Sequence, residues 1–308
     1  MHEHIARVVY YFGVHLLFAS IVWLAAWALT SMSRGSAAAK YWIWMMTSLN
    51  FVLPLGAVLD KSFASYLSWA VPLGVVGPLG VGVADHIAVI GSIWSAGAIL
   101  MFARLSLRLQ AERNARQSED RDAPSPTPSL LLHGIAVRFT DRGQGPAVKG
   151  VLRPHICLPT GIDGILTKPE LDAVLLHELT HARRRDNLIR LIHEVGQCLL
   201  WFHPLVWMTG SRLALYRELS CDEAVIQRAK GKDLVTALAK LANPESAPLL
   251  QATASSFMSI RLSRLIATGP RRACVTANAL LIVAFGTVVS AGIFETAAHT
   301  ACCFAVKK

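Results

Sequence analysis

The chain has 308 residues, of which 16% are charged and 53% are hydrophobic, and its mean hydropathy is +0.44. A soluble domain carries about 25% charged residues, so these values exclude a disordered chain and a wholly water-soluble globule. Of the 50 charged residues, 40 lie between residues 104 and 272. We therefore expect a membrane protein with one soluble domain of about 150 residues. The net charge of +10 forms no basic stripe interleaved with aromatic residues, so we expect no direct binding of nucleic acid.

Five stretches of the chain lack Asp, Glu, Lys and Arg, and a membrane-spanning helix needs about 20 mainly apolar residues. The stretch of residues 62–84 contains two prolines and several glycines, which disfavour a regular helix, so we predict an external loop there. The first 103 residues are thus a membrane region with three spans, and a fourth span follows the soluble part. The predicted spans are residues 8–33, 41–59, 86–103 and 273–294.

Positive charges orient these spans, because Lys and Arg collect in short loops on the cytoplasmic side. With four spans, Arg34 and Lys40 lie on the same side as Arg104 and Arg272. That side is then the cytoplasm, and it holds the soluble domain. The N-terminus and a short tail of residues 295–308 lie outside.

The soluble part begins after a predicted linker of residues 104–129, whose second half is rich in Pro and Ser. Residues 130–159 contain short β-rich runs, which predict two or three strands. Residues 145–152 are a candidate edge strand for an extended substrate. The domain, residues 130–242, is α+β and is followed by a second linker and basic segment, residues 243–272.

Three helices are expected after the strands. Thr167 and Glu170 fit a capping box, with Pro169 in the first turn, and predict a helix over residues 169–184. Asp186 is the expected cap of a second helix over residues 186–201. Pro204 and Gly210 are expected to break the chain before a third helix, residues 211–229.

The first of these helices contains the pattern HExxH, formed by His177, Glu178 and His181. Residues four apart lie on one helical face, so both imidazoles can bind one metal ion, while Glu178 can reach a metal-bound water. Zinc suits neutral imidazoles and lowers the pKa of its bound water to near neutrality. The pattern therefore predicts one Zn²⁺ per chain, with Glu178 as the catalytic base.

A catalytic zinc site usually has a third protein ligand. Glu218 is the expected one, because Asp222 lies one turn further along the same helix, where it could orient a histidine ligand. The alternative is that Glu218 lies on a solvent-exposed helix face and binds no metal. Cys221 is expected to be a buried small residue and not a ligand. His203 is a candidate contact for substrate or transition state, with a structural hydrogen bond as the alternative.

Four segments together resemble the BlaR/MecR family of membrane zinc metallopeptidases, which are antirepressors and signal transducers. These are GVLRPHICLP, HELTHARRRDN, WFHPLVW and RELSCDEAV, at residues 150–159, 177–187, 201–207 and 217–225. The resemblance implies a thermolysin-like domain between spans three and four. It assigns zinc to His177, His181 and Glu218, the base to Glu178, and an orienting role to Asp222.

The resemblance also implies partners and a location. It implies a multi-pass protein in the lipid bilayer of the bacterial inner membrane, which cuts a cytosolic winged-helix transcriptional repressor. Cleavage of the chain itself near Ser256 and Phe257 and a homodimer are further expectations; an ordinary linker is the alternative for the first. Members that sense β-lactams carry a penicillin-binding domain after the last span, and none is expected here, because the tail contains no SxxK.

Two other functions stay open from the sequence. One is a quality-control or processing peptidase for membrane proteins, with a wide and unselective groove. The other is a non-catalytic receptor or scaffold with structural zinc, which a closed site with four protein ligands would favour.

Overall fold

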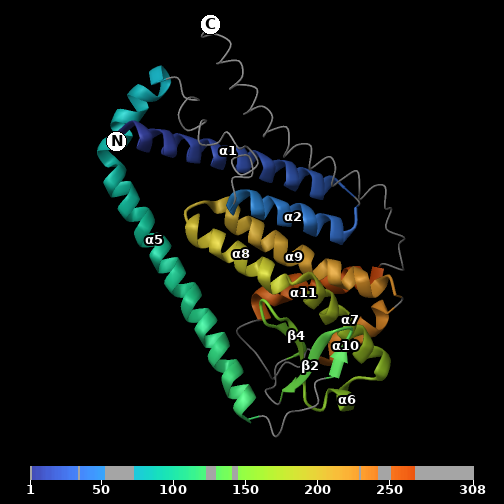
Figure 1. Cartoon of the computed structure of the whole chain (residues 1–308). Helices are drawn as coiled ribbons and strands as arrows, with labels where there is room; N and C mark the ends of the chain where they lie inside the picture. Colours follow the sequence, from blue (N-terminus) through green and yellow to red (C-terminus); the bar gives the residue numbers. More distant parts are fainter. Residues whose placement is uncertain are drawn as a thin grey trace.

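The computed structural model describes residues 2–33, 35–52, 73–122, 130–140, 145–228, 230–241 and 251–267. Figure 1 shows a small sheet with helices α7 and α10 at one end of the molecule. The α8 and α9 pair forms the next layer, followed by α2 and then α1, while α5 runs along one side. This arrangement confirms a mostly helical α+β fold.

The sheet has four strands in the order β1-β2-β4-β3, where two or three were expected. They are β1 (Leu130–Leu132), β2 (Ile135–Thr140), β3 (Ala147–Lys149) and β4 (His155–Pro159). Strands β2 and β4 are parallel, and the two outer pairings are antiparallel. A strand of three residues is too short to show an alternation of apolar and polar residues, so the sequence pattern could not predict the number of strands. Strand β3 is an edge strand, as expected for residues 145–152.

The helices of this part are α6 (Ile162–Ile165), α7 (Lys168–Arg184), α8 (Asp186–Leu199), α9 (Pro204–Ile226) and α10 (Gly231–Leu241). The capping box is present at the start of α7, where the Glu170 carboxylate accepts the backbone N–H of Thr167 at 2.7 Å. The predicted start of the third helix was wrong. Pro204 begins α9 instead of preceding it, because a missing N–H costs nothing in the first turn, and Gly210 is inside the helix.

Two apolar clusters hold these layers together. One lies between the sheet, α7 and α10 and includes Val137, Ile156 and Leu234. The other lies between α1, α2 and α9 and includes Trp44 and Leu213. Helix α9 contributes residues to both clusters, so it joins the layer that carries HExxH to the N-terminal helices.

The N-terminal helices are α1 (His2–Met32), α2 (Ala37–Val52) and α5 (Leu73–Asp122). By length and composition, two described segments could cross a membrane: His15–Met32 and Ala88–Asn114. Helix α2 covers the first part of the predicted span 41–59. The rest of that span and the predicted span 273–294 lie outside the described residues. The four-span count therefore stays a prediction.

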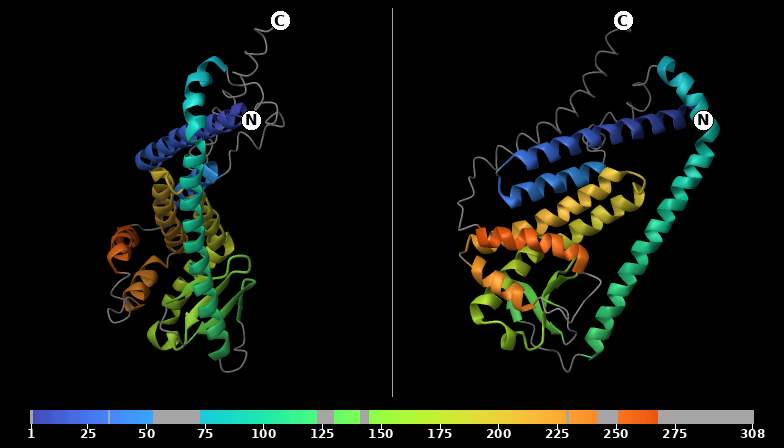
Figure 2. Two further views of the ribbon diagram at one scale, coloured as in Figure 1. Left: turned by 90° about the vertical axis from the view of Figure 1, so that its left-hand side faces the viewer. Right: turned by 180° about the vertical axis from the view of Figure 1, so that it is seen from behind.

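Two expected irregular segments are partly helical. Helix α5 begins within the predicted external loop and continues to Asp122, through most of the predicted linker 104–129. Membrane helices tolerate Pro and Gly, which explains how the segment around Pro78 can be helical. The second linker is also partly helical, because α11 (Gln251–Ala267) begins within it. The views of Figure 2 place α11 alongside α10.

Candidate metal centre

The two histidines of HExxH lie one turn apart on α7 and face the same point. Their Nε2 atoms are 3.2 Å apart. Both side chains are largely buried, with 6% and 12% of the side-chain surface exposed for His177 and His181. The helix that carries them is fixed at its first turn by the capping box and at its last by Arg185, which adopts a left-handed conformation with φ of 56°.

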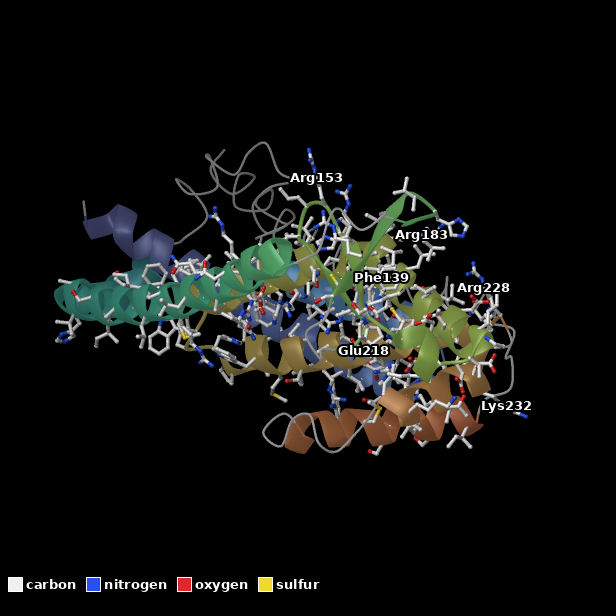
Figure 3. All side chains as sticks on the ribbon, turned by 90° about the horizontal axis from the view of Figure 1, so that it is seen from below. Phe139, Arg153, Arg183, Glu218, Arg228 and Lys232 are labelled. Carbon is white, nitrogen blue, oxygen red and sulfur yellow. The ribbon has the colours of Figure 1, made fainter. Side chains whose placement is uncertain are left out.

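Helix α9 brings Glu218 to the same point, although 37 residues separate it from His181 in the sequence. Its Oε2 lies 3.6 Å from the Nε2 of His177 and 3.8 Å from the Nε2 of His181. In Figure 3 Glu218 lies near the middle of the view, away from peripheral side chains such as Lys232. The structure thus brings together the three residues predicted to bind zinc.

These separations fit a zinc ion. With zinc–ligand bonds of about 2.0–2.1 Å, two ligands of a tetrahedral ion lie about 3.4 Å apart. The three observed separations, 3.2, 3.6 and 3.8 Å, lie close to that value. The donor set of two imidazoles and one carboxylate is also the set that catalytic zinc sites use when a further position is left for water. The residues present therefore fit the metal that the motif predicts.

A carboxylate lies behind each histidine. The Nδ1 of His177 is 3.1 Å from Asp222 Oδ1, in an ion-pair geometry that is not an in-line hydrogen bond. The Nδ1 of His181 is 2.6 Å from Asp186 Oδ2. A carboxylate at Nδ1 holds the proton there and leaves Nε2 free to bind a metal. Asp222 is thus where the sequence predicted it.

The prediction that Asp186 caps α8 was wrong, because Arg185 is the N-cap residue. Asp186 does begin α8, but its side chain caps no helix end. The left-handed turn at Arg185 directs the carboxylate back to His181 instead, and Arg184 also contacts it through Nε at 2.8 Å and Nη2 at 2.7 Å. The signal that could have found this role is a carboxylate that follows directly after the end of the HExxH helix.

The charges of the site stabilise one another. Burial opposes protonation of His177, but the carboxylates of Asp222 and Glu218 outweigh burial and raise its pKa to about 9. Burial likewise opposes protonation of His181, whose pKa is nevertheless raised well above its ordinary value, mainly by Asp186. Burial favours the neutral form of Glu218, yet the two histidines hold its pKa well below its usual range. A bound metal cation would replace these protons at Nε2.

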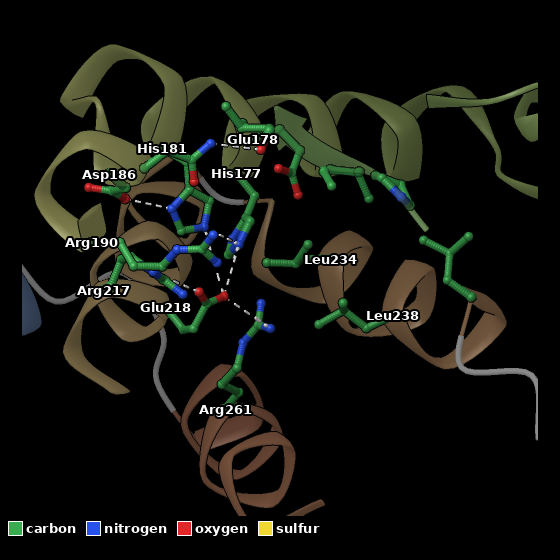
Figure 4. Close-up of a pocket in the computed structure, with 16 residues that line it drawn as sticks. His177, Glu178, His181, Asp186, Arg190, Arg217, Glu218, Leu234, Leu238 and Arg261 are labelled. Carbon is green, nitrogen blue, oxygen red and sulfur yellow. Dashed lines mark hydrogen bonds and ion pairs between the residues drawn. The ribbon is translucent and has the colours of Figure 1, made fainter. Parts of the chain in front are cut away.

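A cavity of about 300 Å³ opens onto the three candidate ligands, and Glu178 lines it beside them (Figure 4). Edge strand β3 forms part of the wall. Asn187, at the start of α8, holds this strand by donating from Nδ2 to the carbonyls of Val148 and Gly150 at 3.0 and 3.1 Å. An apolar wall of the cavity is formed by Val174, Leu234, Leu238 and Leu241.

Two other candidates are not part of this cluster of three. His203 lies at the start of α9, with Nε2 3.4 Å from Ser20 Oγ and its ring 5.3 Å from that of Phe51, and it does not line the cavity. The structure therefore favours the alternative reading of His203 as a structural residue. Cys221 is fully buried, and its Sγ lies 3.5 Å from the Nδ1 of His181, on the side of the ring away from Glu218. Its spacing to His181 and Asp186 would also suit a metal, but Nδ1 is already bound to Asp186.

Fold and site together define a class: an α+β protein in which a helix with HExxH and a second helix with a glutamate converge on one point. The comparisons with known proteins agree with that class. The family described as BlaR1 peptidase M56 matches residues 79–265. The chain belongs to this family of peptidases, and the resemblance noted in the sequence is confirmed.

Two relatives illustrate the match. Regulatory protein BlaR1 of Bacillus licheniformis is 39% identical over 84 residues, which are 27% of this chain and 14% of that protein. The methicillin resistance mecR1 protein of Staphylococcus aureus (strain Mu50 / ATCC 700699) is 25% identical over 93 residues, which are 30% of this chain and 16% of that protein. The matched segments thus span less than a fifth of each relative.

Proposed function

We propose that this chain is a zinc endopeptidase of a bacterial inner membrane, which hydrolyses a peptide bond in a cytosolic protein as a step of signal transduction. The observation that carries the proposal is the convergence of His177, His181 and Glu218 with zinc-like separations in a cavity that Glu178 also lines. Two candidate spans and membership of a peptidase family support the membrane location and the reaction class.

The reaction assigns a task to each residue. Zinc, when bound, supplies a Lewis acid that activates water and polarises the scissile carbonyl. Glu178 takes the proton of the attacking water and delivers it to the leaving nitrogen. Asp186 holds the proton of the His181 imidazole on Nδ1, and the charge of Asp222 beside Nδ1 favours the same arrangement in His177, so that Nε2 of each ring faces the cavity.

The cavity favours an extended peptide as substrate. An extended chain can add to edge strand β3 by main-chain hydrogen bonds, while the apolar wall accepts a large apolar side chain. A winged-helix transcriptional repressor is the substrate we propose, and the names of the relatives, which refer to regulation and to methicillin resistance, agree with a signalling role.

Self-cleavage near Ser256 and Phe257 is a second proposed event. The structure describes both residues as part of α11, so their backbone is helical. A protease that binds its substrate as a strand needs an extended segment. Cleavage there thus requires local unwinding of α11. We expect this cleavage to be slow unless a conformational change elsewhere in the protein unwinds the helix.

The test compares the purified full-length chain with its Glu178→Gln variant. We expect equal zinc content and a loss of repressor cleavage of about a hundredfold to ten-thousandfold, because the variant lacks only the base. Zinc bound by both proteins without cleavage by either, together with a fourth protein ligand, would support a structural zinc instead. Unselective cleavage of unfolded membrane proteins would support a quality-control peptidase.

A further inference from the structure

Both carboxylates that lie behind the histidines also accept hydrogen bonds from side chains of helices that carry none of the candidate zinc ligands. The first is Asp186, which lies behind His181. The hydroxyl of Tyr41 donates to Asp186 Oδ1 at 2.9 Å. Tyr41 is fully buried and belongs to α2, which ends at Val52, whereas the first strand of the peptidase fold begins at Leu130. The guanidinium of Arg184 lies 4.0 Å from the centre of the Tyr41 ring, which fixes the ring in turn.

The second carboxylate is Asp222, which lies behind His177. Arg261 of α11 donates to both of its oxygens, from Nε to Oδ2 and from Nη2 to Oδ1, each at 2.8 Å. The same guanidinium places Nη1 3.5 Å from Glu218 Oε2. Only 11% of the Arg261 side chain is exposed, so this paired contact is shielded from water. Figure 4 shows Arg261 reaching from its own helix toward Glu218.

We propose that Tyr41 and Arg261 are positioning residues, which fix the two carboxylates and through them the two histidines, so that metal affinity depends on how α2 and α11 are docked. The inference rests on the zinc site proposed above.

The physical reason is the number of contacts that each carboxylate makes. A carboxylate held by one partner can rotate about its last bond, and the imidazole that it orients turns with it. Asp186 has Tyr41 and Arg184 on Oδ1 and has His181 and Arg184 on Oδ2. Asp222 likewise has both oxygens bound by Arg261. Hydrogen bonds to both oxygens restrict the rotation of each carboxylate.

The placement of these partners links the site to the rest of the chain. Helix α2 lies against α9 on one side, and α11 lies near α9 and α10 on another (Figures 1 and 2). A shift of either helix would withdraw a hydrogen-bond donor from one carboxylate and so release the histidine that this carboxylate orients. Metal affinity, and with it catalysis, can thus respond to movements in segments that contribute no ligand.

The experiment uses the full-length chain in detergent and the variants Tyr41→Phe and Arg261→Gln. Tyr41→Phe removes one oxygen and leaves the ring. We measure the zinc dissociation constant by competition with a chelator. Mutation of a residue that orients a metal ligand weakens metal binding about 10–100-fold. We therefore expect zinc binding to be about tenfold weaker for Arg261→Gln and about threefold weaker for Tyr41→Phe. Arg261→Lys, which keeps the charge, should recover part of the loss.

Two controls match the chemistry of the variants. Tyr216→Phe removes a hydroxyl from another buried tyrosine of the same cluster, and Arg228→Gln removes a peripheral guanidinium at the end of α9. Both should keep the wild-type affinity. As a second readout, zinc should raise the unfolding temperature less in the two test variants than in wild type, because the stabilisation by a ligand follows its affinity. A merely structural role would lower the unfolding temperature equally with and without zinc.

The proposal is overturned if Tyr41→Phe and Arg261→Gln bind zinc as wild type does while His177→Ala loses zinc. If His177→Ala also keeps its zinc, the proposed zinc site itself is wrong. If Arg261→Gln does not fold, Arg261→Lys is used in its place. Its zinc affinity is then compared with that of the control variant Arg228→Gln.

Discussion

The two halves of helix α9 differ in what they bury. The first half places Val206 and Leu213 in an apolar cluster with α1 and α2, which Tyr216 and Leu219 extend into the second half. The second half places Glu218 and Asp222 against α7, where Asp222 is 2% exposed. A buried charge is costly unless it is paired and hydrogen-bonded. One end of this helix thus stabilises the fold. The other end holds a cluster of charges that stability alone does not require.

The largest expected effect comes from removing a ligand at the charged end. Structural zinc sites with four ligands bind with about 10–16 kcal/mol, or about 2.5–4 kcal/mol per ligand, so the loss of one ligand in Glu218→Gln should weaken zinc binding about a hundredfold to a thousandfold. The control is Glu223→Gln on the same helix, whose side-chain oxygen accepts the N–H of Ala38, a contact that glutamine can keep. Equal zinc affinity in both variants, measured by chelator competition, would exclude Glu218 as a ligand.

A substitution at the apolar end of α9 should lower the stability of the protein without changing its zinc affinity. Leu213 is 5% exposed, and Leu213→Ala should lower the free energy of unfolding by about 2–5 kcal/mol because it leaves a cavity. Folded Leu213→Ala protein should bind zinc as wild type does. Denaturant unfolding in detergent measures the first effect, and Met208→Ala, at a position that is 46% exposed, should show little change. A loss of zinc comparable to that of Glu218→Gln would contradict the division of α9 into two halves.

The contact between α5 and the turn that joins α8 to α9 gives a smaller expected effect. A Cβ at Gly97 would overlap the indole of Trp201, whose Nε1 donates to the Trp94 carbonyl at 3.2 Å. Gly97→Val should therefore destabilise the protein by about 1–3 kcal/mol through overpacking. Gly91→Val on the same helix is the matched control, because a Cβ there meets nothing within 4 Å. Equal unfolding temperatures for the two variants would show that α5 does not pack against Trp201 in this way.

The smallest expected effect is a pH dependence at the start of α7. Hydrogen bonds from Lys240 and from the backbone of Thr167 lower the pKa of Glu170 from 4.5 to about 2. The ionised carboxylate therefore stabilises the fold above pH 4.5, and this contribution is lost as the pH falls toward about 2. Glu170→Gln should be less stable than wild type at neutral pH. The difference in unfolding midpoint should narrow in acid, and a constant difference would argue against the capping role.

Local signals in the sequence predicted much of the site. The capping box and HExxH placed α7 to within one residue and its two histidines on one face. The glutamate and aspartate four apart placed the charged end of α9. These predictions succeeded because the information lies within one or two helical turns.

Contacts between distant segments could not be predicted in the same way. The role of Asp186 depends on a left-handed turn at Arg185, a residue type that rarely adopts one. Tyr41 and Arg261 reach the site from helices far away in the sequence, and no periodic pattern marks them. The strand count and the length of α5 were missed for another reason, since three-residue strands and apolar segments with Pro and Gly give weak or opposing local signals.

The central claim is that one zinc ion is bound by His177, His181 and Glu218. X-ray absorption at the zinc edge of the purified chain tests it most directly, because it reports the elements around the metal and their distances. The account predicts nitrogen and oxygen ligands at about 2.0–2.2 Å and no sulfur. A sulfur ligand at about 2.3 Å would contradict it, because it would place the metal at Cys221 with His181 and Asp186 instead.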